Sequence, residues 1–283
     1  MKIIAAILLG FSLNGCSSLL FQPSRSLYYD PAKMNLSFQE VSFKSLDGTT
    51  LSGWYFKHTD QREKPKAVIC FVHGNAQNIS SHFMALTFAL AKGYDFFVFD
   101  YRGYGSSAGE VEGPRAGVED TISGLRYANE RAQELGVPLA VFAQSLGTAL
   151  AVRALVEEKE TLHPAFITLD SSFISFEWAG ASVLSQFWLT TPFQPLAFLL
   201  LSDEWAPGRR IRELAPTPIL FLHGEDDRII RPRLGREAYE AALPPKEFIL
   251  VPGVGHIGAF WGADGERIRR LFLEKMDHSV ETP

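Results

Sequence analysis

Six short runs of apolar residues recur along this chain, and each is followed by a longer, more polar segment. Each run is rich in Val, Ile, Leu and Phe and ends near Gly, Asp or Ser; the runs are 67–72, 95–99, 138–142, 166–169, 218–222 and 247–251. Strands that are buried on both faces have this continuous pattern, and parallel strands need long crossover connections. The pattern therefore predicts an α/β fold built on a mostly parallel sheet.

The segments around these runs complete the expected sheet and its helices. Two alternating runs, 41–44 and 51–56, are joined across Asp47-Gly48, which is a strong hairpin signal. With them the sheet has roughly eight strands. The helices expected to flank it are 79–92, 115–134, 147–158, 233–242 and 265–276.

Composition limits the number of domains and the kind of partner. The chain has 283 residues, of which 46% are hydrophobic, so it can bury one sizeable core. We expect a single main domain from residue 37 to residue 283. The formal net charge is −5, and no run of basic residues is interleaved with aromatic residues, so nucleic acid is not an expected partner.

The first fifteen residues have the pattern of an export signal. Lys2 is followed by an apolar stretch, 3–13, that is too short to span a bilayer comfortably, and Gly15 then precedes Cys16. We interpret residues 1–15 as a signal peptide that is removed from the mature chain. An uncleaved anchor and a signal peptide without lipidation are the alternatives.

Leu13-Asn14-Gly15-Cys16 resembles the lipobox of bacterial lipoproteins, in which the cysteine is acylated and becomes the new N-terminus. The resemblance implies that Cys16 is the lipid attachment site, and two or more acyl chains give stable membrane attachment. Residues 16–36 would then be a lipid-anchored tether that lies on or near the body. Ser17 is typical of cargo sorted to the outer membrane, so we expect the protein in the bacterial cell envelope, at the outer membrane in a Gram-negative host.

The segment from 171 to 202 interrupts the alternation of strands and helices. It contains one charged residue, Glu177, and seven aromatic residues. Connections of this length in compact domains are usually lids or binding loops. Pro192 and Pro195 break any continuous helix, so a transmembrane span is not expected. We predict a small helical cap insertion, 171–205, over the C-terminal edge of the sheet.

The third of the six apolar runs leads into Ala143-Gln144-Ser145-Leu146-Gly147, and a helix-like segment follows. A small residue, a serine two positions later and a glycine two positions after that are the pattern of a nucleophile elbow between a strand and a helix. Ser145 is therefore the predicted nucleophile. The alternative interpretation is that Ser145 is an ordinary helix N-cap.

Acids and a histidine follow other strands, at the edge where open α/β sheets bind ligands. An alcohol that attacks near neutral pH needs a base, and the base needs an acid to orient it. Ser145, Asp227 and His256 occur in the order serine, acid, histidine that nucleophile-elbow hydrolases use. Asp226 and Asp170 are alternatives for the acid.

Five motifs together resemble the α/β-hydrolase superfamily, and within it the Bem46-like branch of serine hydrolases. The motifs are His73-Gly74-Asn75, the turn 100–105, the elbow at Ser145, His223-Gly224-x-x-Asp227 and Gly255-His256. The resemblance extends from about residue 37 to residue 276. It implies the α/β-hydrolase fold, and it favours Asp227, four residues after His223, as the acid of the triad.

The remaining candidate roles concern residues around the elbow. Acyl transfer places negative charge on the carbonyl oxygen, and the backbone amides of Leu146 and Asn75 are the expected donors to it. We expect Arg102 to brace the glycine-rich turn to a carboxylate rather than to bind an anionic substrate group. Cys70 lies within an apolar run and is expected in the core.

The sequence predicts a serine esterase that cleaves carboxylic esters, or thioesters, through an acyl-enzyme intermediate. The nearly uncharged cap favours an apolar, lipid-like acyl group. No metal or organic cofactor is implied, because the histidines lack His-x-x-x-His spacing and the glycine-rich turn 103–105 does not have the phosphate-cradling form. A peptidase or amidase of short peptides and a non-catalytic lipoprotein scaffold are the alternative functions.

Overall fold

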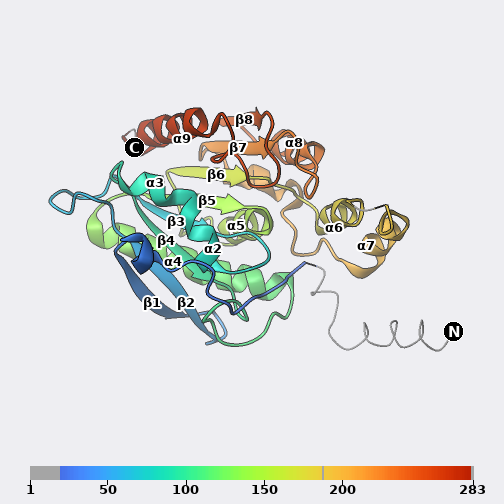
Figure 1. The fold of residues 1–283 in the computed structure, drawn as a ribbon, viewed down its shortest axis with the longest axis horizontal. Coiled ribbons are helices and arrows are strands. Elements are labelled where there is room, and N and C mark those ends of the chain that lie inside the picture. The colour runs from blue at the N-terminus through green and yellow to red at the C-terminus, as the bar shows by residue number, and fades with distance from the viewer. Residues whose placement is uncertain (1–19, 187, 282–283) are drawn as a thin grey trace.

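The computed structural model describes residues 20–186 and 188–281, and it contains one sheet of eight strands (Figure 1). The predicted signal peptide and Cys16 lie outside the described residues. The strands are β1 (Phe38–Lys44), β2 (Thr50–Phe56), β3 (Val68–Val72), β4 (Asp95–Asp100), β5 (Leu139–Gln144), β6 (Phe166–Asp170), β7 (Ile219–Gly224) and β8 (Lys246–Val251), in the spatial order β1-β2-β4-β3-β5-β6-β7-β8.

The sheet is parallel except at one end. β1 pairs antiparallel with β2, and β2 pairs antiparallel with β4, whereas β4, β3, β5, β6, β7 and β8 pair in parallel. Every residue of β3 to β7 is buried, as the continuous apolar runs predict. The predicted fold class, an α/β-hydrolase fold on a mostly parallel sheet of roughly eight strands, is confirmed.

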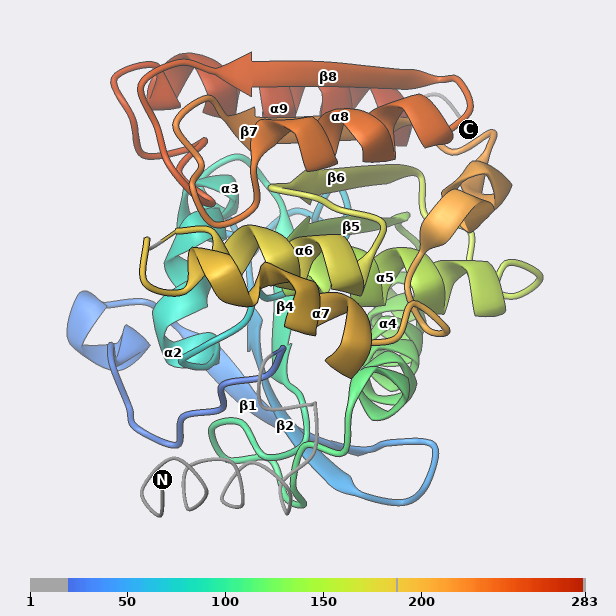
Figure 2. The same ribbon diagram turned by 90° about the vertical axis from the view of Figure 1, so that its right-hand side faces the viewer.

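Helices cover both faces of the sheet and create two hydrophobic cores. The longer helices are α4 (Pro114–Leu135), α5 (Leu146–Glu157), α8 (Pro232–Ala241) and α9 (Gly265–Glu281). Residues of α4, α5 and α8 join the core on one face, and residues of α9 join the core on the other (Figure 2). This arrangement leaves the carboxyl ends of the parallel strands to the loops that carry the candidate site.

The expected helix 79–92 is three short pieces instead. They are α2 (Ile79–His82), a 3-10 turn (Phe83–Leu86) and α3 (Thr87–Leu90). The hydroxyls of Ser81 and Thr87 each donate to a backbone carbonyl three residues earlier, at 2.9 and 3.1 Å. Such local hydrogen bonds can compete with the regular helical ladder.

The segment after β6 forms a small helical hairpin that projects from the body (Figures 1 and 2). It contains α6 (Phe176–Leu184), a 3-10 turn (Thr191–Phe193) and α7 (Gln194–Leu200). The carboxylate of Asp203 accepts from the amides of Phe176 and Glu177, at 2.7 and 3.2 Å, and so joins the end of the hairpin to its start. Within the described ranges, no helix has both the length and the apolar character that crossing a membrane requires.

Residues 20–30, the described beginning of the predicted tether, pack against the body as an arm. Phe21 is buried in the larger core. Pro23 and Gln77 form an isolated parallel bridge. The guanidinium of Arg25 donates to backbone carbonyls of the turn after β4, which are those of Gly105, Ser107 and Gly109. The arm is therefore held to the loops at the carboxyl edge of the sheet.

Arg102 is buried and braces the turn after β4, as expected. Its guanidinium donates to both carboxylate oxygens of Asp120 on α4, with a shortest distance of 2.8 Å. It also donates to Asp47 in the hairpin at 2.8 Å and to the hydroxyl of Ser45 at 3.2 Å. These contacts join the hairpin, the turn and α4, and Arg102 does not line the candidate site.

We predict that Arg102→Met lowers the free energy of unfolding by about 3 to 5 kcal/mol, because it leaves the buried carboxylate of Asp120 without its cation. Arg126 pairs with Glu158 at 2.8 Å but is half-exposed, so Arg126→Met is the matched control and should cost about 1 kcal/mol or less. Urea denaturation of both variants measures the difference. Equal losses would contradict the bracing role.

Candidate active site

Ser145 lies at a strained turn between β5 and α5. Its backbone has φ +51° and ψ −120°, a left-handed conformation that non-glycine residues rarely adopt. Its side chain makes no capping hydrogen bond with α5, so the structure does not support the N-cap alternative. The strand, the tight turn and the helix together have the form of a nucleophile elbow.

Gly147 allows this turn to exist. A Cβ atom at this position would lie 2.2 Å from the carbonyl oxygen of Val72 and 2.4 Å from that of His73, both in the neighbouring strand end and its loop. Only a residue without a side chain lets the first turn of α5 approach β3 so closely. Ala143, at the other end of the motif, is fully buried in the core.

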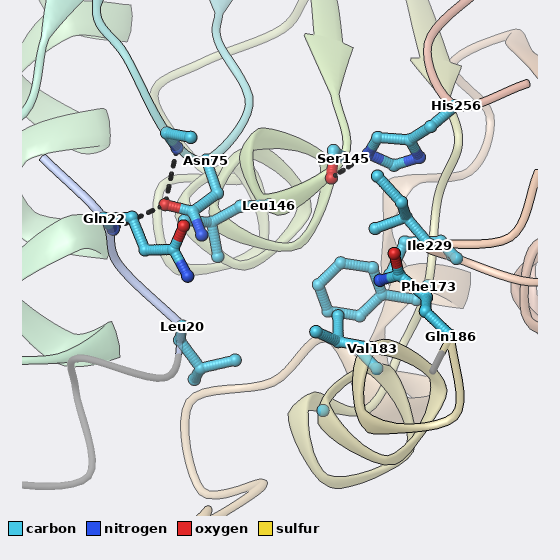
Figure 3. A pocket seen from close by; sticks show the side chains of 14 residues that line it. Leu20, Gln22, Asn75, Ser145, Leu146, Phe173, Val183, Gln186, Ile229 and His256 are labelled. Carbon is cyan, nitrogen blue, oxygen red and sulfur yellow. Dashed lines mark hydrogen bonds between the residues drawn. The ribbon is translucent and has the colours of Figure 1, made fainter. Parts of the chain in front are cut away.

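The structure brings Ser145, His256 and Asp227 together from three separate loops. Nε2 of His256 lies 2.8 Å from Oγ of Ser145 (Figure 3), and Nδ1 of His256 lies 2.8 Å from Oδ2 of Asp227. A base in hydrogen-bond contact with an alcohol, and oriented by an acid, is the arrangement that activates a serine. Asp226 is exposed, and its amide donates to the carbonyl of Val254.

The carboxylate of Asp227 is held by several donors. Its Oδ1 accepts from the amides of Ile229 and Ile230, both at 2.9 Å. Nε2 of His223 lies 3.4 Å from its Oδ2 and 2.8 Å from the carbonyl oxygen of Ile230. Burial raises the pKa of Asp227, but the hydrogen bonds with His223 and His256 outweigh burial and hold it well below its usual range. The group is therefore a carboxylate at neutral pH.

The two residues whose amides are expected to bind the oxyanion, Leu146 and Asn75, follow strands β5 and β3. Leu146 is the first residue of α5, so its N–H has no partner within the helix. Asn75 follows β3, and its side-chain Oδ1 accepts from the amide of Ala76 at 2.7 Å. Both residues line the same cavity as Ser145 (Figure 3).

Asn75 also receives support that the sequence does not reveal. Its Oδ1 accepts from the backbone amide of Gln22 in the arm at 2.8 Å and from the hydroxyl of Tyr104 at 2.9 Å. Tyr104 belongs to the turn 100–105, one of the five motifs on which the family resemblance rests. Gln22 acts through its backbone, so its residue type carries no signal at all.

A cavity of about 220 Å³ opens above Ser145 and His256 (Figure 3). Its walls come from the arm, the loop after β3, α6 and the loop after β7. The lining residues are Leu20, Gln22, Asn75, Ala76, Ser145, Leu146, Phe173, Ala179, Gly180, Val183, Gln186, Ile229, Ile230 and His256. None of these side chains carries a carboxylate, an ammonium or a guanidinium group, so the walls are suited to an apolar group.

Similarity to known proteins agrees with this geometry. The family model described as serine aminopeptidase, S33, matches residues 63–194. The YfhR protein of Escherichia coli O157:H7 is 31% identical over 239 residues, which cover 84% of this chain and 80% of YfhR. The bem46 protein of Schizosaccharomyces pombe is 25% identical over 243 residues, which cover 81% of this chain and 75% of bem46. The chain belongs to the Bem46-like branch of the α/β hydrolases.

Solved structures show the same fold. The Pyrococcus furiosus esterase Pf2001 superposes with a TM-score of 0.71 over 90% of this chain and 98% of that one, at 21% identity. At this identity the likeness concerns the fold alone.

Asp170, an alternative for the acid, contacts the elbow. No hydrogen bond joins its carboxylate to His256, whose Nδ1 is bonded to Asp227. Asp170 is fully buried, and its Oδ2 accepts from the side-chain amide of Gln144 at 3.1 Å. Its backbone carbonyl accepts from the amide of Ser145 at 2.9 Å. Burial raises the pKa of Asp170 to about 6, although the hydrogen bond from Gln144 opposes this change.

Cys70 is fully buried in β3, and burial raises the pKa of its thiol, as expected for a core residue. In residues 20–186 and 188–281, no three or more His, Cys, Asp or Glu side chains are grouped so that they could hold a metal ion.

The raised pKa of Asp170 predicts a pH-dependent stability. The folded protein keeps this proton to a higher pH than the unfolded chain, so the free energy of unfolding falls by up to roughly 3 kcal/mol as the pH rises from about 4 to above 6. Asp170→Asn removes this contribution and keeps an acceptor for Gln144. In urea denaturation, its stability relative to wild type should rise over that pH range. A pH-independent difference would contradict the assignment.

Proposed function

We propose that this protein is a serine esterase that hydrolyses carboxylic esters, or thioesters, through an acyl-enzyme intermediate. The observation that carries the proposal is the continuous hydrogen-bonded series Ser145, His256 and Asp227 at the floor of an apolar cavity. The membership in the α/β hydrolases supports the same chemistry.

The first half of the reaction forms the acyl-enzyme. Oγ of Ser145 attacks the ester carbonyl carbon while Nε2 of His256 takes the hydroxyl proton, and Asp227 stabilises the imidazolium that results. The carbonyl oxygen becomes negatively charged and accepts hydrogen bonds from the amides of Leu146 and Asn75. His256 then gives its proton to the departing alcohol or thiol.

The second half releases the acid. A water molecule loses a proton to His256 and attacks the acyl carbon, and the bond to Oγ of Ser145 breaks as the proton returns to the serine. The apolar side chains of Phe173, Val183 and Ile229 would contact the acyl group.

An ester is favoured over a peptide by the chemistry of the cavity walls. The family model is named for aminopeptidases, which act on substrates with a free ammonium group. A buried ammonium needs a compensating carboxylate, and no Asp or Glu side chain lines the described cavity. The walls instead offer the aliphatic and aromatic surface that binds an acyl chain.

We further propose that acylated Cys16 holds the protein at the bacterial cell envelope. Cys16 lies outside the described residues, but the arm that follows it is packed onto the body from Leu20 onward. A lipid anchor would therefore hold the catalytic domain close to the membrane rather than on a long linker.

We predict that Ser145→Ala abolishes labelling by a fluorophosphonate probe and lowers kcat for a short-chain ester by a factor on the order of 10⁴ to 10⁶. Ser171→Ala is the matched control, because it removes a hydroxyl that accepts from the amide of Ile257, next to the histidine. That variant should still be labelled. Equal labelling of wild type and Ser145→Ala would show that another residue is the nucleophile.

We expect a preference for octanoyl over acetyl esters, because the cavity walls that would contact the acyl group are apolar. Val183→Trp fills part of the cavity and should lower kcat/KM for octanoyl esters by about tenfold more than for acetyl esters, a difference of about 1.4 kcal/mol. Turnover of the acetyl ester serves as the internal control for an intact triad. Faster turnover of acetyl than of octanoyl esters by the wild type would contradict the assigned acyl site.

The anchor predicts a change in location. Cys16→Ser removes the thiol that would be acylated, so a large share of the protein should move from the membrane fraction to the soluble fraction of cells. Metabolic labelling with an alkyne fatty acid should mark the wild type and not the variant. An unchanged membrane fraction together with unchanged labelling would contradict lipidation at Cys16.

A further inference from the structure

Helix α7 is apolar and yet almost entirely uncovered. Of its seven residues, only Ala197 is buried. The exposed large apolar side chains of the hairpin form what we call the cap face; they are Trp178, Trp188, Leu189, Phe193, Leu196, Phe198, Leu199 and Leu200. Trp188 is 82% exposed and Leu199 is 77% exposed. A helix that is hydrophobic on all sides is normally buried, and an apolar patch of this kind marks an interaction surface.

Most of the cap face lies on α7 and on the loop that joins it to α6, and Leu200 at its end also lines a cavity with Leu20 of the arm. α6 lies between the body and α7, with Ala179 and Ala181 buried against the core. The rings of Trp178 on α6 and Phe198 on α7 pack edge to face, with centroids 5.0 Å apart. Figures 1 and 2 show α7 at the outer side of the hairpin, so a flat partner can reach it without meeting the body first.

Arginines border the apolar surface. Arg228, Arg231 and Arg233 are exposed on the loop after β7 and at the start of α8. The guanidinium of Arg233 lies 5.2 Å from the ring centroid of Trp178. An apolar face bordered by arginine is the composition of surfaces that lie in the interface of anionic membranes.

Acidic groups are also close to this border. Glu237 pairs with Arg233 at 3.2 Å, and Glu225 and Asp226 are exposed on the loop that carries Arg228. The only charged residue within the hairpin itself, 171–202, is Glu177. Glu177 is thus the one carboxylate between 171 and 202, and the others near the border are on the loop after β7, on α8 and, at Asp203 and Glu204, directly after α7.

The course of the chain favours a bilayer as the partner. Leu20, where the described chain begins, lines one cavity with Leu200 and Leu201 and another with Ser145. Nineteen residues precede it, and they include Cys16, the proposed lipid attachment site. Cys16 is four residues away, so it lies within about 14 Å of Leu20 even on a fully extended chain. The described chain thus begins beside Leu200 of the cap face.

We propose that the cap face docks on a lipid bilayer that contains anionic lipids, with α7 in the interface and the arginines at the head groups. Leu20 and the cap both line the cavity above Ser145, so an ester dissolved in the bilayer enters the cavity without passing through bulk water. The docking is inferred from the exposed apolar residues of the cap face alone, whereas the delivery of an ester rests on the proposed function.

Fluorescence quenching tests the docking. The full chain is added to vesicles of phosphatidylglycerol and brominated phosphatidylcholine, and bromine quenches only indoles that reach the acyl region. We expect quenching of the wild type that is largely lost when Trp178→Phe and Trp188→Phe, the two tryptophans of the cap face, are combined. Trp261 is 58% exposed and lies outside the cap, so Trp261→Phe is the matched control and should retain the quenching. Equal quenching of the wild type and of the variant that lacks both cap tryptophans overturns the proposal.

A second variant separates docking from catalysis. Leu189→Ser, Phe193→Ser and Leu199→Ser together should lower hydrolysis of a long-chain ester held in the vesicles by at least about tenfold, with turnover of a soluble short-chain ester within about twofold of wild type. Equal loss on both esters overturns the proposal. A second outcome also overturns the proposal. If vesicles cause no quenching and the wild type is a dimer that these substitutions dissociate, a second copy of the chain covers the cap face and a bilayer does not. Quenching at the cap tryptophans without any ester hydrolysis leaves docking intact and refutes the esterase.

Discussion

The close approach of α5 to the end of β3 at Gly147 is the constraint on which the site depends. The carbonyl oxygen of Val72 occupies the space that a Cβ would need, so the chain turns sharply and Ser145 takes a left-handed backbone. Such a conformation costs of order 1 to 3 kcal/mol and persists only where the surroundings enforce it. Here β5 and the first turns of α5 are fully buried, so packing supplies that enforcement and presents the hydroxyl to His256.

The elements around the elbow hold one another in place. The hydroxyl of Ser182 on α6 donates to the carbonyl of Ile229 at 2.7 Å and accepts from the amide of Arg231 at 3.3 Å. Ile229 and Arg231 flank Ile230, and the amides of Ile229 and Ile230 both donate to Asp227. The cap is therefore joined to the loop that carries Asp227. On the opposite side, the arm supports Asn75. The cap and the arm, the two parts that would face a membrane, are thus in contact with the site.

The sequence was sufficient for the sheet and for the candidate triad. Buried parallel strands leave continuous apolar runs, and their ends meet at one edge, so Ser145, His256 and an acid could be expected together, and the family resemblance selected Asp227 as that acid. The contribution of Gln22 could not be predicted, because a backbone amide has no residue-type signature. The exposure of α7 could not be predicted either, since its apolar residues have the composition of a buried helix. The division of the expected helix 79–92 into three short pieces could not be predicted, because the apolar periodicity continues across them.

The most direct test of the account is the covalent intermediate itself. The wild type is mixed with an octanoyl ester, quenched in acid within its first turnovers, digested and analysed by mass spectrometry. If Ser145 is the nucleophile, an octanoyl group is found on the peptide that carries Ser145, at the serine. An acyl group on another residue would contradict the assignment of Ser145 as the nucleophile. So would ester hydrolysis during which the peptide that carries Ser145 is never found acylated.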